Sequence, residues 1–333
     1  FFACFWVGAT FTSQIAPFAI LFNLTYVLHL VFLGAVFHLA AVSGPQPIAP
    51  FAAVMACGLV IFAAVILAKF LDPPAGRAIE TIRWQFAIPG MISVRLFGAM
   101  LAPCVVLFVY LALSESSHRI KGIWTVAAAA FASGFLVWTG TRAGILGAAA
   151  ALTIGLLCFR MEVLSRRFLM VLCACVGGAL IGIALIPYGD PDFMLFVARD
   201  LTSANAATSG RLVWWGDLLF AYREFPVFGA GPGASSYILG SMHESHIQPH
   251  NLIIGFLLNW GFIATAAALF LVGRAHLMAH RTARRFRDVA PYVLMADCLL
   301  VIAFFDGTFH FAQHLMIWAL VIALALAASR RQR

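Results

Sequence analysis

Long stretches in which almost every side chain is apolar dominate the sequence. A helix needs about 20 mostly apolar residues to cross a bilayer, and about ten stretches approach or exceed that length. They run approximately over residues 1–13, 16–40, 48–70, 96–113, 123–140, 142–159, 168–187, 251–272, 290–305 and 312–328. The stretches do not alternate apolar and polar residues as barrel strands do. The sequence therefore predicts an all-α, polytopic membrane helix bundle.

The composition excludes other classes of protein. Of the 333 residues, 63% are hydrophobic and 10% are charged, whereas a soluble domain is about half apolar and a quarter charged. A soluble protein of this size has too little interior to bury so much apolar surface. The seven cysteines all lie in apolar stretches, which favours buried small side chains over disulfides or zinc ligands. The chain begins with Phe1 inside such a stretch, so we expect that an N-terminal portion is missing.

Basic residues predict how the chain crosses the membrane. The net charge is +8, and arginines concentrate between Arg274 and Asp288, in the C-terminal tail and around Arg166. Such clusters mark the cytoplasmic side of a membrane, so the surplus does not point to nucleic acid. This orientation predicts one membrane domain over residues 1–333, with a large external loop at 188–249 between late spans that carries part of the site.

Residues 72–95 depart from this charge rule. The alternation of the spans places these residues on the side of the membrane opposite to the cytoplasm. Even so, the basic residues Arg77, Arg83 and Arg95 outnumber the acids Asp72 and Glu80. Either a span is miscounted or the external cations have an anionic partner, and we favour the partner because the rule is a statistical bias.

The predicted external loop contains a pattern typical of an amphipathic helix. It covers Arg211–Phe225, with apolar residues near one face at Leu212, Trp215, Leu219 and Tyr222. Ser209 is a plausible N-cap, and Pro226 with the glycines of 229–233 ends the helix in a turn.

Three polar features lie at the predicted outer face. Arg142 stands between two spans joined by almost no linker, where a guanidinium can bind phosphate or simply extend to the interface. Arg211 begins the loop helix, where backbone N–H groups favour anions, although an arginine there can also be merely solvated. His250 precedes a span, where an imidazole suits proton transfer or an interfacial structural role.

Other polar residues carry less information. The spacing of His243, His246 and His250 gives metal ligation little support, because Pro249 breaks a helix through them and no Cys or paired Asp joins them. Asp297 lies within a span, where an acid is either functional or hydrogen-bonded to neighbouring helices. His29 and His38 are interpreted as hydrogen-bonding residues within the bundle.

Taken in order, the polar motifs resemble the O-antigen ligase and O-antigen polymerase superfamily of bacterial envelope glycosyltransferases. The residues that carry the resemblance are Thr139-Gly-Thr-Arg142-Ala-Gly, Ser209-Gly-Arg211 with Trp214-Trp215, Phe225-Pro-Val-Phe-Gly229-Ala-Gly-Pro-Gly233, and His250-Asn251 followed by nine residues and Gly261. In ligases a second glycine follows three residues later, where this chain has Ala264.

The resemblance implies a periplasmic site that transfers a glycan from an undecaprenyl-diphosphate donor to lipid A–core, without a metal or cofactor. It places His250 as the general base on the acceptor hydroxyl, and Arg142 and Arg211 on the donor diphosphate. We add Arg95 as a further arginine on the outer side. Paired guanidiniums can stabilise a departing diphosphate, and a base on the opposite side would give inversion.

Three other activities stay open. An O-antigen polymerase or a protein O-oligosaccharyltransferase would use the same donor, and one sequence does not reveal the acceptor. A transporter of lipid-linked glycan would be expected to have several intramembrane charges and repeated halves. The sequence has one deep acid, Asp297, and no internal repeat, which favours transfer over transport.

Overall fold

The computed structural model describes residues 8, 11–13, 16–43, 48–71, 88, 91, 93–114, 119–159, 161, 165–186, 210–242 and 248–330. These residues form helices and no strands. Eight of the helices are long and apolar enough to cross a membrane, and the shorter apolar helix Gly122–Trp138 adds a further candidate. The chain is thus an all-α, multi-pass membrane protein, as the sequence predicts.

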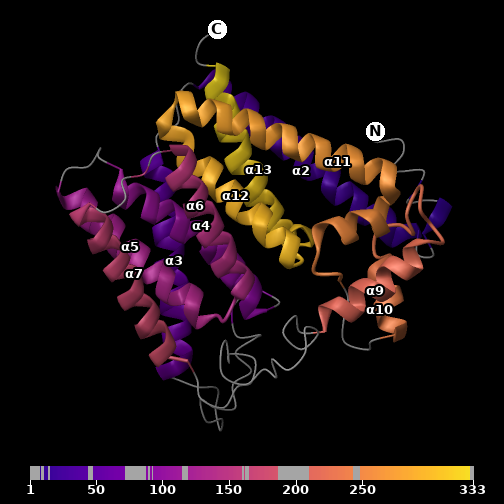
Figure 1. Cartoon of the computed structure of the whole chain (residues 1–333), viewed down its shortest axis with the longest axis horizontal. Coiled ribbons are helices and arrows are strands. Elements are labelled where there is room, and N and C mark those ends of the chain that lie inside the picture. Colours follow the sequence, from indigo (N-terminus) through magenta and orange to yellow (C-terminus); the bar gives the residue numbers. More distant parts are fainter. Residues whose placement is uncertain are drawn as a thin grey trace. The chain divides into compact units, whose positions relative to one another are not determined.

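The helices coincide with the predicted spans to within a few residues (Figure 1). They are α2 (Ala16–Val42), α3 (Ile48–Leu71), α4 (Val94–Leu113), α5 (Arg119–Trp138), α6 (Arg142–Phe159), α7 (Arg166–Ala184), α12 (Ala290–Phe305) and α13 (Ala312–Ala327). The predicted span at 1–13 lies mostly outside the described residues.

Helix α11 differs from its predicted span. It covers Leu252–Arg285, whereas the apolar stretch ends near residue 272 and an arginine-rich loop was expected from Arg274. The segment after Gly273 contains no glycine or proline before the helix ends, and its alanine, leucine, methionine and arginine residues have high helix propensity. The helix therefore continues past the end of its apolar stretch.

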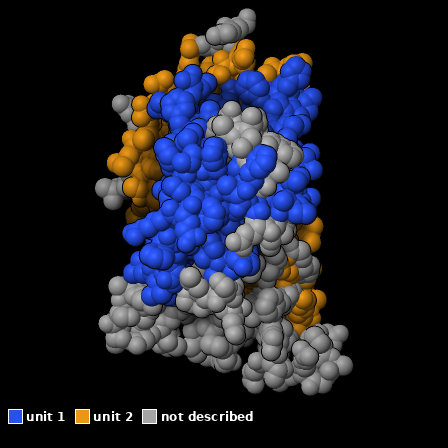
Figure 2. Space-filling view, turned by 90° about the vertical axis from the view of Figure 1, so that its right-hand side faces the viewer, with its two compact units in different colours: residues 1–39, 199–279, 303–326 blue, residues 40–198, 280–302, 327–333 orange. Residues whose placement is uncertain are grey.

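The chain divides into two compact units (Figure 2). Unit 1 comprises residues 1–39, 199–279 and 303–326, and unit 2 comprises residues 40–198, 280–302 and 327–333. The prediction of a single membrane domain with a periplasmic loop at 188–249 stays a prediction.

Small residues allow close helix packing within unit 2. A Cβ on Gly178 of α7 would lie 2.0 Å from the Ala130 carbonyl oxygen of α5, and one on Gly182 would lie 2.2 Å from the Gly134 oxygen. Backbones can approach this closely only where side chains are absent, which is a common basis of helix association in membranes.

A backbone junction in unit 1 joins α11 to the segment Pro226–Ala230. Gly261 interrupts the helix with φ 70° and ψ 179°. Ala230 N then donates to Leu258 O at 2.7 Å, and Phe262 N donates to Pro226 O at 2.9 Å. We call this arrangement the Gly261 junction. It explains why two separate glycine-containing motifs occur in the sequence, because the backbones of the two segments touch.

Replacing Gly261 with alanine is expected to destabilise the protein by about 2 kcal/mol or more, since φ is positive and the new Cβ would lie 2.1 Å from Val227 O. Gly273 on the same helix is the matched control, because nothing lies within 4 Å of a Cβ there. Gly273→Ala should be neutral or stabilising. Thermal unfolding of the purified variants in detergent measures the difference, and equal melting temperatures would contradict the junction.

Candidate functional site

Helix α9 positions Arg211 in unit 1. The helix covers Arg211–Tyr222 and begins after Gly210, which has a left-handed φ of 81° at the N-cap position. The predicted helix is therefore confirmed but ends three residues early, and the proposed cap Ser209 lies outside the described residues. The glycines and Pro226 that follow form turns, as predicted.

The face of α9 that packs inward includes Trp215 and Tyr222 as predicted, but Leu218 in place of Leu212 and Leu219. Leu218 is fully buried against Ile254 and Leu258 of α11, whereas Leu212 and Leu219 are 43% and 42% exposed. Apolar residues occur on more than one face of α9, so the pattern alone cannot select the packed side. Trp214, Trp215 and Tyr222 complete the contact and hold α9 on α11.

The backbone around His250 is fixed by four hydrogen bonds. Trp215 Nε1 of α9 donates to Pro249 O at 2.7 Å. Asn251 Oδ1 accepts from Ile253 N and Ile254 N at 2.9 and 3.1 Å and so caps the first turn of α11. Asn251 Nδ2 also donates to Phe304 O at 3.2 Å, which ties this turn to the end of α12.

His250 itself has a left-handed backbone conformation with φ 49°. Few residues other than glycine adopt it, although histidine does so more often than most. The flanking bonds of Pro249 and Asn251 hold this conformation. The imidazole then reaches Asp306, and His250 Nδ1 lies 2.7 Å from Asp306 Oδ1.

The Asp306 carboxyl is buried, with an exposed side-chain fraction of 8%. Burial by itself raises its pKa, but the hydrogen bond with His250, the charges of protonated His250 and of Arg211, and the Gly307 N–H lower the pKa to about 2. Asp306 is therefore ionised at neutral pH and can only accept hydrogen bonds. The Nδ1 atom of His250 must then carry the shared hydrogen, which leaves Nε2 of the neutral ring able to accept a proton.

Arg211 belongs to the same site. Its Nη1 donates to the Phe305 carbonyl oxygen, one residue before Asp306, and its charge contributes to the lowered pKa of that acid. The structure thus brings together Arg211 and His250, two residues predicted from the sequence, around a third that was not predicted.

Asp306 was missed because nothing nearby in the sequence marks it. It lies 56 positions after His250 and directly follows the apolar stretch of α12. The available signal was an acid followed by glycine at the end of a span, in Asp306-Gly-Thr-Phe-His310. Only the folded arrangement shows that this acid faces a histidine.

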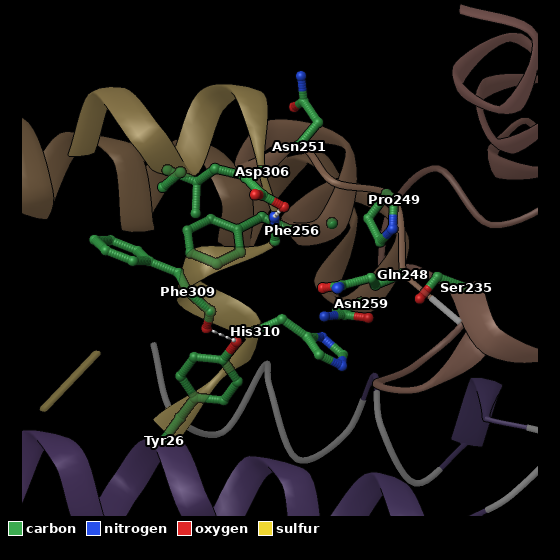
Figure 3. A pocket seen from close by; sticks show the side chains of 14 residues that line it. Tyr26, Ser235, Gln248, Pro249, Asn251, Phe256, Asn259, Asp306, Phe309 and His310 are labelled. Atoms are coloured by element: carbon green, nitrogen blue, oxygen red, sulfur yellow. Dashed lines mark hydrogen bonds between the residues drawn. The ribbon is translucent and has the colours of Figure 1, made fainter. Parts of the chain in front are cut away.

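A small polar pocket of about 30 Å³ adjoins Asp306 (Figure 3). Figure 3 shows the side chains of Gln248, Asn259 and His310 close together in it. Burial and the charge of His250 lower the pKa of His310 to about 4, so this ring is neutral at neutral pH. The pocket therefore places hydrogen-bonding side chains beside the His250–Asp306 pair.

The other two predicted arginines belong to unit 2, where the backbone of Arg95 meets the residue before Arg142. Thr141 Oγ1, next to Arg142, donates to Arg95 O at 3.2 Å and lies 2.9 Å from Thr139 Oγ1. A Cβ on Gly98 would lie 2.0 Å from Thr141 Oγ1, so the close approach requires glycine. Arg142 is exposed at the start of α6.

The other predicted residues differ in their surroundings, and His38, predicted to hydrogen-bond within the bundle, is exposed. Asp297 Oδ2 lies 2.9 Å from His280 Nε2, so this intramembrane acid contacts a histidine of the neighbouring helix α11. His29 lies 2.6 Å from Thr25 O and 3.1 Å from Ala312 O, as predicted for a residue that bonds within the bundle. His243 and His246 lie outside the described residues.

Part of the chain matches a known protein family. Residues 127–269 match the family described as O-antigen ligase, which confirms the resemblance read from the sequence motifs. The matched region includes Arg142, Arg211, His250 and the Gly261 junction, and it supports a membrane glycosyltransferase of the O-antigen ligase and polymerase type. No curated protein matches the chain.

Asn251 provides a test of how the His250 backbone is held. Asn251→Ala should cost about 1 kcal/mol of stability, because it removes the cap of α11. Asn251→Asp retains an acceptor for the cap but loses the donor to Phe304 O, so we expect it to recover most of that loss. Melting temperatures in detergent report the effect, and an unchanged value for Asn251→Ala would be inconsistent with a capping role.

Proposed function

We propose that this protein transfers an O-antigen-type glycan from undecaprenyl diphosphate to a hydroxyl of lipid A–core, at the periplasmic face of the bacterial inner membrane. The observation that carries the proposal is the pairing of His250 with the ionised Asp306, beside Arg211. A base held by a carboxylate next to a fixed cation is the arrangement that transfer to a hydroxyl requires.

His250 is proposed as the general base. As its Nε2 accepts the proton of the acceptor hydroxyl, the acceptor oxygen forms a bond to the anomeric carbon of the donor sugar. Asp306 would hold the ring in the required tautomer and stabilise the imidazolium that forms, much as a carboxylate does in a serine protease triad. The mechanism is then a single inverting displacement.

Arginines are proposed to bind the leaving group. As the bond between the anomeric carbon and the diphosphate oxygen breaks, its electron pair passes to that oxygen and negative charge increases there. Arg211 would stabilise this charge, and Arg142 and Arg95 are proposed as further arginines that bind the donor diphosphate. Guanidiniums bind phosphate oxygens in bidentate geometry, so the proposal assigns no metal or cofactor.

The alternatives differ in the acceptor or in the class of activity. A polymerase would extend unfinished O-antigen, and a protein O-oligosaccharyltransferase would modify a protein hydroxyl, with the same donor and base. A transporter would move the donor without breaking the sugar–diphosphate bond. Membranes supplied in parallel with lipid A–core, unfinished O-antigen and a protein acceptor separate all four, and we expect transfer to lipid A–core.

The roles of His250 and Arg211 can be tested with matched controls. His250→Ala and Arg211→Ala should each lower the transfer rate about 100-fold or more, since a general base or an electrostatic group typically contributes that much. His38→Ala and Arg223→Ala alter exposed residues of the same types and should leave the rate near wild type. Glycan transfer in extracted membranes is the readout, and full activity of either site variant would refute its role.

Asp306 gives a pH-dependent test. Because the pKa of Asp306 is lowered to about 2, the carboxylate stays ionised between pH 5 and 9, a range that we choose for the assay. Asp306→Asn should therefore lower the transfer rate by about 10²-fold to 10⁴-fold throughout that range, instead of shifting the pH optimum. A variant that regains wild-type activity at any pH in the range would show that the fixed charge is dispensable.

A further inference from the structure

Gln248 has no role in the steps proposed above, although it lies two residues before the proposed base. The residue is 7% exposed, and its side chain lines the small pocket beside Asp306 (Figure 3). The Oε1 atom of its carboxamide has no hydrogen-bond partner in the described part of the chain. Because a buried acceptor without a partner is unfavourable, we expect a donor group from outside the chain at this atom.

Gly307 makes the room that the Gln248 carboxamide occupies. A Cβ on Gly307 would collide with Gln248 Oε1, so a larger residue would push this side chain away. Gly307 directly follows Asp306, and its N–H donates to Asp306 Oδ1 at 2.8 Å. The glycine after the acid therefore allows the unpartnered oxygen of Gln248 to lie next to the residue that holds the proposed base.

The size of the pocket limits what can bind there. Its volume is about 30 Å³, whereas one water molecule needs about 10–15 Å³. The buried polar residues Ser235 and Asn259 also line it, and they add hydrogen-bonding atoms to its walls. The pocket is too small for a sugar ring, so a ligand can place only one small polar substituent in it.

The chemistry of the pocket selects among the groups of the proposed substrates. Gln248 Oε1 can only accept a hydrogen bond, so its ligand must carry a donor. The oxygens of an ionised diphosphate only accept, and the ionised Asp306 in the pocket wall disfavours an anion. A hydrocarbon chain has no donor. A sugar hydroxyl can both donate and accept, and together with its carbon it fits the volume.

We propose that this pocket binds a hydroxyl of a sugar at the reaction centre and that Gln248 accepts its hydrogen bond. The inference rests on the proposed function, whose donor and acceptor both carry sugar hydroxyls. Only Pro249 separates Gln248 from His250, so a sugar held by Gln248 has its ring fixed close to the proposed base. Such fixing orients the reacting atoms, and Gln248 thereby selects and orients the substrate.

Gln248→Met tests the hydrogen bond, because methionine has a similar length and no carbonyl oxygen. The purified full chain in detergent is titrated separately with undecaprenyl diphosphate, with lipid-linked glycan extracted from the source organism, and with lipid A–core. We expect about tenfold weaker binding of one of the two sugar-bearing lipids, which identifies the donor or the acceptor as the source of the hydroxyl. Binding of the sugar-free diphosphate should be unchanged.

Gln313→Met is the matched control, because Gln313 is exposed, and it should bind all three lipids as wild type does. Thermophoresis measures the affinities, and melting temperatures identify the folded variants.

Gly255→Ala is a second variant, which keeps the test decisive if Gln248→Met does not fold. Gly255 lines the pocket, and a Cβ there would meet Pro249 Cγ at 3.4 Å, so the methyl group narrows the pocket without a collision. We expect at least fivefold weaker binding of the same sugar-bearing lipid. Gly273→Ala adds a methyl group to the same helix in open space and should bind as wild type does.

Two results would overturn the inference. One is equal affinity of wild type and the folded pocket variants for both sugar-bearing lipids, which would leave only water for the pocket. The other is an equal loss of affinity for the sugar-free diphosphate, which would indicate a structural effect. Because binding needs no turnover, absent transfer by wild type with a sugar-dependent loss in Gln248→Met would refute the proposed function alone. Wild-type protein that binds neither sugar-bearing lipid would refute both.

Discussion

The hydrogen bond between His250 and Asp306 is the interaction on which the candidate site depends. It joins residues 56 positions apart at a distance of 2.7 Å, and it fixes which nitrogen of the imidazole can act as a base. The bond forms because His250 adopts a left-handed backbone conformation, which costs about 1–3 kcal/mol. Trp215 and Asn251 stabilise that conformation through the neighbouring backbone.

The same parts of the chain that stabilise His250 also connect the sequence motifs to each other. Helix α9 begins with Arg211 and supplies Trp215 to the His250 segment. The segment after α9 then meets α11 at the Gly261 junction, so α11 is held at its capped start and again at its interruption. The motifs that contain Arg211, Gly229 and His250 are therefore one hydrogen-bonded assembly in unit 1, whereas the motif with Arg142 belongs to unit 2.

Much of the fold could be predicted because membrane helices are selected by length and apolarity, which are local properties of the chain. Most of the spans, the helix at Arg211 and the turn after Pro226 follow from such local signals. The packed face of α9 followed only in part, because apolar residues occur on several of its faces and only contact with α11 selects Leu218. The continuation of α11 to Arg285 was missed because the apolar stretch ends before the helix does.

Only part of the candidate site could be predicted, because only some of its residues belong to local sequence motifs. His250, Arg142 and Arg211 could be identified from motifs, and Arg95 from its unusual charge environment. Asp306 could not be, since its role comes from a contact between distant segments. The interaction of Thr141 with the Arg95 carbonyl likewise depends on how α4 meets the turn before α6. The binding of a donor diphosphate by Arg95, Arg142 and Arg211 stays a prediction.

The protonation state of His250 tests the central claim most directly. Nitrogen NMR of ¹⁵N-histidine-labelled protein in detergent, with the signal assigned by comparison with His250→Gln, reports which ring nitrogen carries the hydrogen in the neutral form. The account predicts the hydrogen on Nδ1, and loss of that preference in Asp306→Asn. A neutral ring with its hydrogen on Nε2, or a spectrum unaffected by Asp306→Asn, would contradict it.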